Sequence, residues 1–267
     1  MGDGLAKRLA RAFKLVVDPG GFIVIAVKPR EMIRPRGPDS AYPVLLARFG
    51  RERDAMAARF AELQPLFNAP ELDACESAAS GATFRNGYFS GTDARLAYAM
   101  TRHARPKRIV EVGSGYSTHF FRKAIVDGGL ETRVTCIDPA PRAEVESVAD
   151  RVIRRSVLDA GRDAFADMAA GDILFVDGSH YAFNGSDVSH IFLNILPELP
   201  PGVLVHFHDI MLPYEYDALF TSRHYNEQYL LAVLLQSANW DILYPVYFLC
   251  QQGVMPGQGS SFWLKRR

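Results

Sequence analysis

The sequence predicts an α/β protein built on a mostly parallel sheet, with helices wound on both sides of it. From about residue 105 onward, short β-branched runs alternate with helical stretches, which is the pattern of βα units. One unit carries a glycine-rich turn between a strand and a helix, at residues 113–118. Two further strand candidates end in polar residues, at 177–180 and 208–209. We therefore expect a ligand site at the carboxyl ends of the strands, where an open α/β sheet forms its crevice.

Composition limits the possible functions. The chain has 267 residues, and its 30 basic side chains balance 30 acidic ones. This balance argues against broad nucleic-acid binding, which needs a basic face. The longest apolar run near the start, residues 22–27, is far shorter than the roughly 20 residues of a membrane span. Cys75, Cys136 and Cys250 lie far apart and cannot all pair, so we expect a protein of the reducing cytoplasm.

We predict that residues 1–80 form a helical extension. One face of a helix over residues 5–17 would carry the apolar side chains of Leu5, Leu9, Phe13, Val16 and Val17, with basic side chains opposite. We expect this face to pack on the rest of the chain or across a homo-oligomer, with contact to an anionic membrane surface as the alternative. A second helix is expected over residues 41–67, where large apolar residues recur at helical intervals.

The glycine-rich turn follows a strand candidate at residues 107–112 and precedes a helical stretch at 119–125. Glycines permit a tight turn and close backbone approach, and the start of a helix supplies free N–H groups for a ligand. A second strand candidate, at 133–137, ends at Asp138. A carboxylate at that distance from the turn is placed to accept the hydroxyls of an adenosine ribose.

Two residues select the nucleotide. Thr118 stands in the region of the third glycine of the dinucleotide fingerprint, and Glu111 immediately precedes the turn region. A carboxylate there would repel a pyrophosphate but attract a cation. S-adenosylmethionine carries an ammonium and a sulfonium and has no phosphate, so the turn favours it over NAD. The predicted cofactor-binding residues are Glu111, Gly113, Ser114, Gly115, Ser117, Asp138 and Asp177.

Residues 109–115 and 136–138 resemble the class I S-adenosylmethionine-dependent methyltransferases. Residues 172–180 and 206–210 resemble the methyltransferase-24 type, a branch akin to small-molecule and sugar O-methyltransferases. The resemblance covers roughly residues 86–235. It implies a Rossmann-like, doubly wound sheet of seven strands with a final antiparallel hairpin, for which residues 240–250 and 260–265 are suitable. We accordingly divide the chain into an N-terminal helical extension (1–80) and an S-adenosylmethionine-binding domain (81–267).

The polar strand ends supply the candidate catalytic residues Asp177, His180, His208 and Asp209. A histidine could take the proton of an acceptor hydroxyl, because its ordinary pKa lies near neutrality. Alternatively, Mg²⁺ or another divalent cation could lower the pKa of that hydroxyl. Related metal-dependent O-methyltransferases have aspartates at these two strand ends, which implies Asp177 and Asp209 as the ligands. Their usual further acidic or amide ligand is replaced by His208 or Ile210.

Other polar and aromatic residues have a structural interpretation. His206 lies within an apolar strand, and we expect it to be a hydrogen-bonded interior histidine. A helix is expected over residues 187–196, and another begins at Asn226 with a polar end that could face the cleft. The aromatic residues after the fifth strand could wall a substrate pocket or pack in the core; they are Tyr214, Tyr216, Phe220 and Tyr225.

The favoured function is methyl transfer from S-adenosylmethionine to a hydroxyl of a small-molecule or sugar-like acceptor. One alternative is a metal-dependent hydrolase that uses His206, His208 and Asp209, although it leaves the glycine-rich turn unexplained. Another is a protein that keeps the cofactor-binding fold without catalysis and acts as a binding partner.

Overall fold

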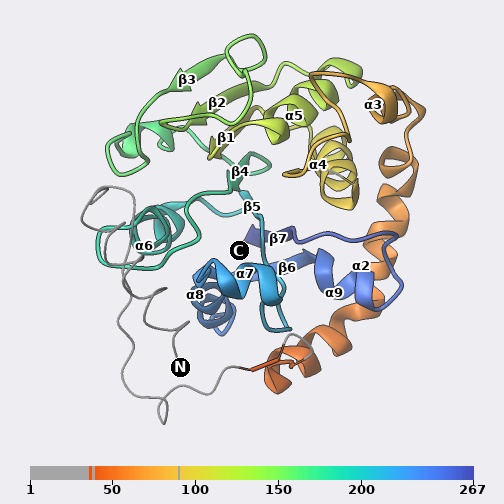
Figure 1. The fold of residues 1–267 in the computed structure, drawn as a ribbon, viewed down its shortest axis with the longest axis vertical. Helices are drawn as coiled ribbons and strands as arrows, with labels where there is room; N and C mark the ends of the chain where they lie inside the picture. Colours follow the sequence, from red (N-terminus) through yellow and green to blue (C-terminus); the bar gives the residue numbers. More distant parts are fainter. Residues whose placement is uncertain (1–35, 38–39, 90) are drawn as a thin grey trace, which may run out of the picture. The chain divides into compact units, whose positions relative to one another are not determined.

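A seven-stranded sheet forms the centre of the computed structural model, which describes residues 36–37, 40–89 and 91–267 (Figure 1). The strands run in the order β3-β2-β1-β4-β5-β7-β6. Strands β1 to β5 are parallel, and β7 runs antiparallel to both β5 and β6. The predicted sheet and its antiparallel end are confirmed. The strand bounds are β1 (Arg108–Val112), β2 (Arg133–Ile137), β3 (Arg151–Ile153), β4 (Ile173–Val176), β5 (Leu204–Phe207), β6 (Trp240–Pro245) and β7 (Phe262–Arg266).

The central strands are buried on both faces, as their nearly continuous apolar runs require. Their register aligns their carboxyl ends: Val112 of β1 lies beside Val176 of β4, which lies beside Phe207 of β5. The residues that follow, Gly113, Asp177 and His208, therefore emerge at one edge of the sheet. Strand order reverses between β1 and β4, so this edge is also the topological switch point where α/β sheets bind ligands.

Helices pack on this sheet through their apolar sides. The long helix α2 buries Phe49, whose ring lies 5.6 Å from that of Phe248 and 5.9 Å from that of Phe262. It thus joins the same hydrophobic core as the sheet. The α-helices are α2 (Pro43–Phe67), α3 (Ala74–Ser77), α4 (Gly91–Ala104), α5 (Tyr116–Asp127), α6 (Asp187–His190), α7 (Ala218–Ser222), α8 (Glu227–Leu234) and α9 (Val246–Gln251). Short 3₁₀ turns, η1 (Pro70–Leu72), η2 (Arg162–Ala164) and η4 (Leu196–Glu198), and a π-helical turn, η3 (Ile191–Ile195), complete the fold.

Three predicted elements differ in their bounds. The helix expected from residue 119 begins at Tyr116, because the Thr118 hydroxyl accepts the N–H of Gly115 and closes the first turn. The strand expected over residues 240–250 ends at Pro245, which has no N–H for the ladder, and α9 follows it. The helix expected over residues 187–196 is divided between α6, η3 and the start of η4.

The predicted helix over residues 5–17 lies outside the described residues. Residues 43–67 and 74–77 are helical, in line with a helical extension, and the division at residue 80 stays a prediction. Among the described residues, no helix combines the length and the apolar character needed to span a membrane.

Candidate active site

The turn after β1 is fixed by close contact with the end of β4. Gly113 has a φ of +82°, and a Cβ there would lie 1.9 Å from the carbonyl oxygen of Asp177. A hydrogen bond also joins the two segments, since the Asp177 N–H donates to the Val112 carbonyl at 2.8 Å. Only glycine satisfies both the backbone conformation and this approach. The glycine therefore brings the turn against Asp177.

A cavity of about 440 Å³ opens beside this turn. Three of the predicted cofactor-binding residues line it, namely Gly113, Asp138 and Asp177. The Asp138 carboxylate accepts the N–H groups of Ser114 at 2.7 Å and Ala140 at 2.8 Å. Oδ2 also accepts the Ser114 hydroxyl at 3.3 Å, whereas Oδ1 accepts only the Ala140 N–H among the described residues and keeps capacity for a ligand hydroxyl. A third carboxylate, Asp187, and the guanidinium of Arg142 also line the cavity, together with the apolar side chains of Val112, Ile137, Pro139, Ala140, Val157 and Leu158.

Glu111 lies beneath the turn and is fully buried. Burial raises the pKa of its carboxyl to about 7, although hydrogen bonds from Thr118, Ser117 and Cys136 oppose the shift. The Cys136 thiol donates to it across 3.4 Å. Glu111 and Ser117 are therefore placed to support the turn from inside the protein and are not among the residues that line the cavity.

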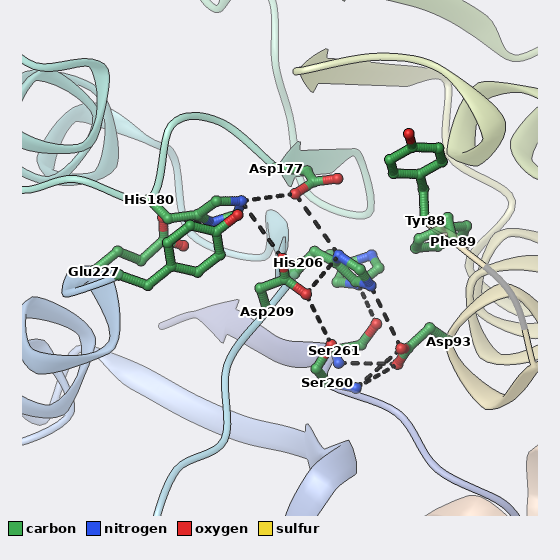
Figure 2. Close-up of polar contacts among 12 residues, drawn as sticks. Tyr88, Phe89, Asp93, Asp177, His180, His206, Asp209, Glu227, Ser260 and Ser261 are labelled. Atoms are coloured by element: carbon green, nitrogen blue, oxygen red, sulfur yellow. Dashed lines mark hydrogen bonds and ion pairs between the residues drawn. The ribbon is translucent and has the colours of Figure 1, made fainter. Parts of the chain in front are cut away.

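The four candidate catalytic side chains lie together (Figure 2). His180 Nε2 is 3.3 Å from Asp177 Oδ1 and 3.6 Å from Asp209 Oδ2. His208 Nδ1 is 3.7 Å from Asp177 Oδ1 and 3.4 Å from Asp209 Oδ1. Both aspartates thus lie between the two imidazoles, which is the convergence that the strand ends predict.

Each imidazole has a third carboxylate, which lies at its opposite ring nitrogen. Glu227, at the start of α8, places Oε2 3.4 Å from His180 Nδ1. Asp93, in the first turn of α4, places Oδ2 3.4 Å from His208 Nε2. The sequence analysis did not identify either acid as part of the site. The polar end of the helix after Asn226 was a signal for Glu227, whereas Asp93 resembled an ordinary residue of a helix start.

The Asp93 carboxylate is held by backbone donors. It accepts the N–H groups of Ser260, at 2.9 Å, and Ser261, also at 2.9 Å, from the segment before β7. Burial opposes ionisation, but His208 and these donors hold the pKa of Asp93 below its usual value. Asp93 therefore stays charged and fixes the His208 ring.

The carboxylates also govern the histidines. Burial opposes protonation, yet Asp177 and Glu227 raise the pKa of His180 well above its ordinary value. Asp209 and Asp177 do the same for His208. Four carboxylates against two imidazoles leave the cluster net negative even when both rings are protonated, so the site favours a cation.

A second cavity, of about 460 Å³, lies on the other side of this cluster. Asp93, His208 and Asp209 line its inner end, and its wall carries the large side chains of Tyr88, Met211, Phe220 and Tyr247. Of the four aromatic residues with two open interpretations, Phe220 lines this cavity. Tyr216 is buried, and its ring packs against that of Phe220 with the ring centroids 5.7 Å apart.

His206 does not belong to the cluster. It is fully buried, its Nε2 forms a 2.7 Å hydrogen bond with the Ser261 hydroxyl, and its ring stacks 4.2 Å from Trp263. Burial lowers its pKa well below the ordinary value, so the ring is neutral. The interior role predicted for His206 is confirmed, and a metal site built on His206, His208 and Asp209 has no support from this geometry.

Comparison with known proteins identifies the domain. Residues 110–210 match the family model Methyltransf_24, described as a methyltransferase domain. This part of the chain is a methyltransferase domain. The matched span runs from β1 through Asp209, so it includes the glycine turn, Asp138 and the four candidate catalytic residues. The prediction of a class I methyltransferase, in fold and in enzyme class, is confirmed.

Several solved structures resemble the chain at low identity. An S-adenosylhomocysteine-bound methyltransferase of Podospora anserina is 15% identical, with a TM-score of 0.44, over 100% of this chain and 97% of that one. An O-methyltransferase of Bacillus cereus is 14% identical, with a TM-score of 0.44, over 80% and 91%. The O-methyltransferase TomG of Streptomyces achromogenes is 18% identical, with a TM-score of 0.39, over 79% and 88%. With these scores below 0.5, the assignment rests on the domain match and the strand order. No curated protein matches the sequence.

Proposed function

We propose that the protein transfers a methyl group from S-adenosylmethionine to a hydroxyl oxygen of a small-molecule or sugar-like acceptor. The observation that carries this proposal is the pair of adjoining cavities. Asp177 lines the first, Asp209 and His208 line the second, and His208 Nδ1 is only 3.7 Å from Asp177 Oδ1. A donor in one cavity and an acceptor in the other would meet at these side chains, and such positioning supplies much of the rate of a transfer reaction.

The residues of the first cavity suit S-adenosylmethionine. Asp138 offers carboxylate oxygens for ribose hydroxyls, the wall at Val157 and Leu158 suits an adenine ring, and Asp177 offers negative charge to a cationic group. When bound, S-adenosylmethionine supplies an electrophilic methyl group on a positively charged sulfur. Gly113 keeps the turn close enough to Asp177 for these groups to share one cavity.

His208 is the group that we assign to the acceptor's proton. It lines the acceptor cavity, whereas His180 lines neither cavity. Asp93 accepts the Nε2–H and orients the ring, which leaves Nδ1 facing the reacting centre. The acceptor oxygen would form its bond to the methyl carbon as its proton passes to Nδ1, so charge does not build up on either partner.

A divalent cation between Asp177 and Asp209 would assist this step. Carboxylate oxygens are ligands that such cations prefer, and the cluster's excess negative charge fits one. The cation would lower the pKa of the acceptor hydroxyl and reduce the negative charge that holds a proton on His208. This leaves the imidazole free to act as a base near neutral pH.

Two measurements test the proposed function. Calorimetry should detect S-adenosylmethionine binding to the full chain, and mass spectrometry of a cell extract treated with isotopically labelled cofactor should detect a labelled methyl ether. Binding without any labelled product would instead favour the non-catalytic alternative. Failure to bind would refute the proposal. The cytoplasmic location and a homo-oligomer formed through the N-terminal helices stay predictions.

A further inference from the structure

We propose that His180 is a ligand of the cation and that the site selects a first-row transition-metal ion over Mg²⁺. The ligand set would be Asp177, His180 Nε2 and Asp209, since each of these residues offers a ligand atom within 4.8 Å of those of the other two. This inference rests on the proposed function, because it places the cation at the centre where the two cavities meet.

His180 is poorly placed for any contact with the acceptor. Only 3% of the residue is exposed, and it lines neither cavity. Its ring stacks on Tyr225 at 4.2 Å, and its carbonyl oxygen accepts the Asn226 N–H at 3.0 Å. These contacts fix the ring in one orientation, with Nε2 directed at the two aspartates (Figure 2).

The opposite ring nitrogen has the partner that metal-binding histidines need. Nδ1 faces Glu227, whose side chain is 1% exposed and has no hydrogen-bond donor other than this imidazole among the described residues. A carboxylate at Nδ1 fixes the tautomer with its proton on that nitrogen and makes the other nitrogen a better ligand. Nε2 then faces the two aspartate carboxylates, and a divalent cation shared by the three groups would take the place of the proton on that nitrogen.

The distances suit a cation with little rearrangement. Ligand atoms about 2.1 Å from a metal and at right angles to one another are about 3 Å apart. The distances of 3.3 and 3.6 Å from His180 Nε2 to the aspartate oxygens are slightly longer than this. His180 and Asp209 also adopt left-handed backbone, with φ of +64° and +58°, a strain that concentrates at functional sites.

The nitrogen ligand determines the class of metal. Mg²⁺ prefers oxygen ligands and keeps several waters, whereas imidazole suits ions such as Co²⁺, Zn²⁺ and Fe²⁺. One imidazole with two carboxylates is a mixed set that raises affinity for the transition ions far more than for Mg²⁺.

Metal titrations of the full chain test the selectivity. We expect Co²⁺ to bind at least about 100-fold more tightly than Mg²⁺. Glu227→Gln should weaken Co²⁺ binding by about 10–100-fold. His190→Ala is the matched control and should leave the affinity unchanged, because this ring, at the end of α6, contacts Asn194 of η3. Equal affinity for Mg²⁺ and Co²⁺, or no binding of either, would overturn the inference.

Electron spin echo spectroscopy of bound Mn²⁺ tests the ligand itself. The wild-type protein should show modulation from an imidazole nitrogen, and His180→Ala should lose it while His208→Asn keeps it. Loss in His208→Asn alone would make His208 the ligand and refute this assignment. Cofactor calorimetry on the same samples separates the two proposals. If the protein binds the cofactor and transfers methyl groups without metal, only the cation site is refuted. If the metal has a nitrogen ligand but the cofactor does not bind, only the methyl transfer is refuted.

Discussion

Replacement of Glu111 by glutamine should remove a specific pH dependence from the stability of the protein. Glu111 is buried beneath the glycine turn, and burial raises its pKa from 4.5 to about 7. In the unfolded chain the same carboxyl is solvated and ionises near its ordinary value. Between these two pKa values, the folded protein therefore holds a proton that the unfolded chain has released.

The size and sign of the effect follow from linkage. A pKa difference from 4.5 to about 7 corresponds to about 3 kcal/mol. Below pH 4.5 both states are protonated, and the group costs no stability. Between pH 4.5 and about 7, this carboxyl ionises in the unfolded chain but stays protonated in the folded protein. Ionisation stabilises the unfolded chain, so the free energy of unfolding falls as the pH rises. The loss is complete once the folded state also ionises, above pH 7.

Urea unfolding of both proteins between pH 4 and pH 8 measures this effect. The free energy of unfolding of the wild-type protein should fall by about 3 kcal/mol more than that of Glu111→Gln over this range. Other titrating groups are common to the two proteins and cancel in the comparison. Parallel pH profiles for the two proteins would show that Glu111 is not held neutral, and the argument from burial would then be wrong.

Four further substitutions have defined outcomes. Gly113→Ala should lower the free energy of unfolding by at least about 2 kcal/mol, because residue 113 has a positive φ and a Cβ there would meet the backbone at the end of β4. Gly50→Ala is the control: this position lies in open space on α2, so the substitution should raise the free energy of unfolding by about 1 kcal/mol in the same urea assay. Asp138→Ala should weaken S-adenosylmethionine binding by about 1.5–3 kcal/mol per lost hydrogen bond, as measured by calorimetry. His208→Asn should reduce turnover by about 10²–10⁴-fold while cofactor affinity stays within a few-fold.

Much of the fold could be predicted because its determinants are local. The apolar runs of β1, β4 and β5, the glycine after β1 and the aspartate after β2 are all visible in short segments. The convergence of Asp177 and Asp209 was predictable too, since carboxyl ends of neighbouring parallel strands meet at one edge. The pattern of βα units predicts the parallel sheet, and the family resemblance implies the seven-stranded arrangement of its strands.

The acids behind the histidines could not be predicted in this way. Asp93 precedes His208 by more than a hundred residues, and it meets that ring because α4 and the segment before β7 pack together, with Ser260 and Ser261 donating to its carboxylate. Tertiary contacts between a helix start and a loop leave no periodic signal in the sequence. The left-handed backbone of His180 is equally invisible, because histidine has no local preference that would require it.

The neutral composition of the chain conceals a strongly acidic centre. Thirty acidic side chains balance thirty basic ones, yet Asp93, Asp177, Asp209 and Glu227 surround only two imidazoles at the meeting point of the cavities. Among the described residues, those that line the acceptor cavity include neither lysine nor arginine. An anionic acceptor would therefore meet repulsion without a compensating partner, whereas a neutral, hydroxyl-rich acceptor can use the same carboxylates as hydrogen-bond acceptors. The same charge favours a cationic methyl donor over its neutral-sulfur product, so the centre's electrostatics support both substrate entry and product departure.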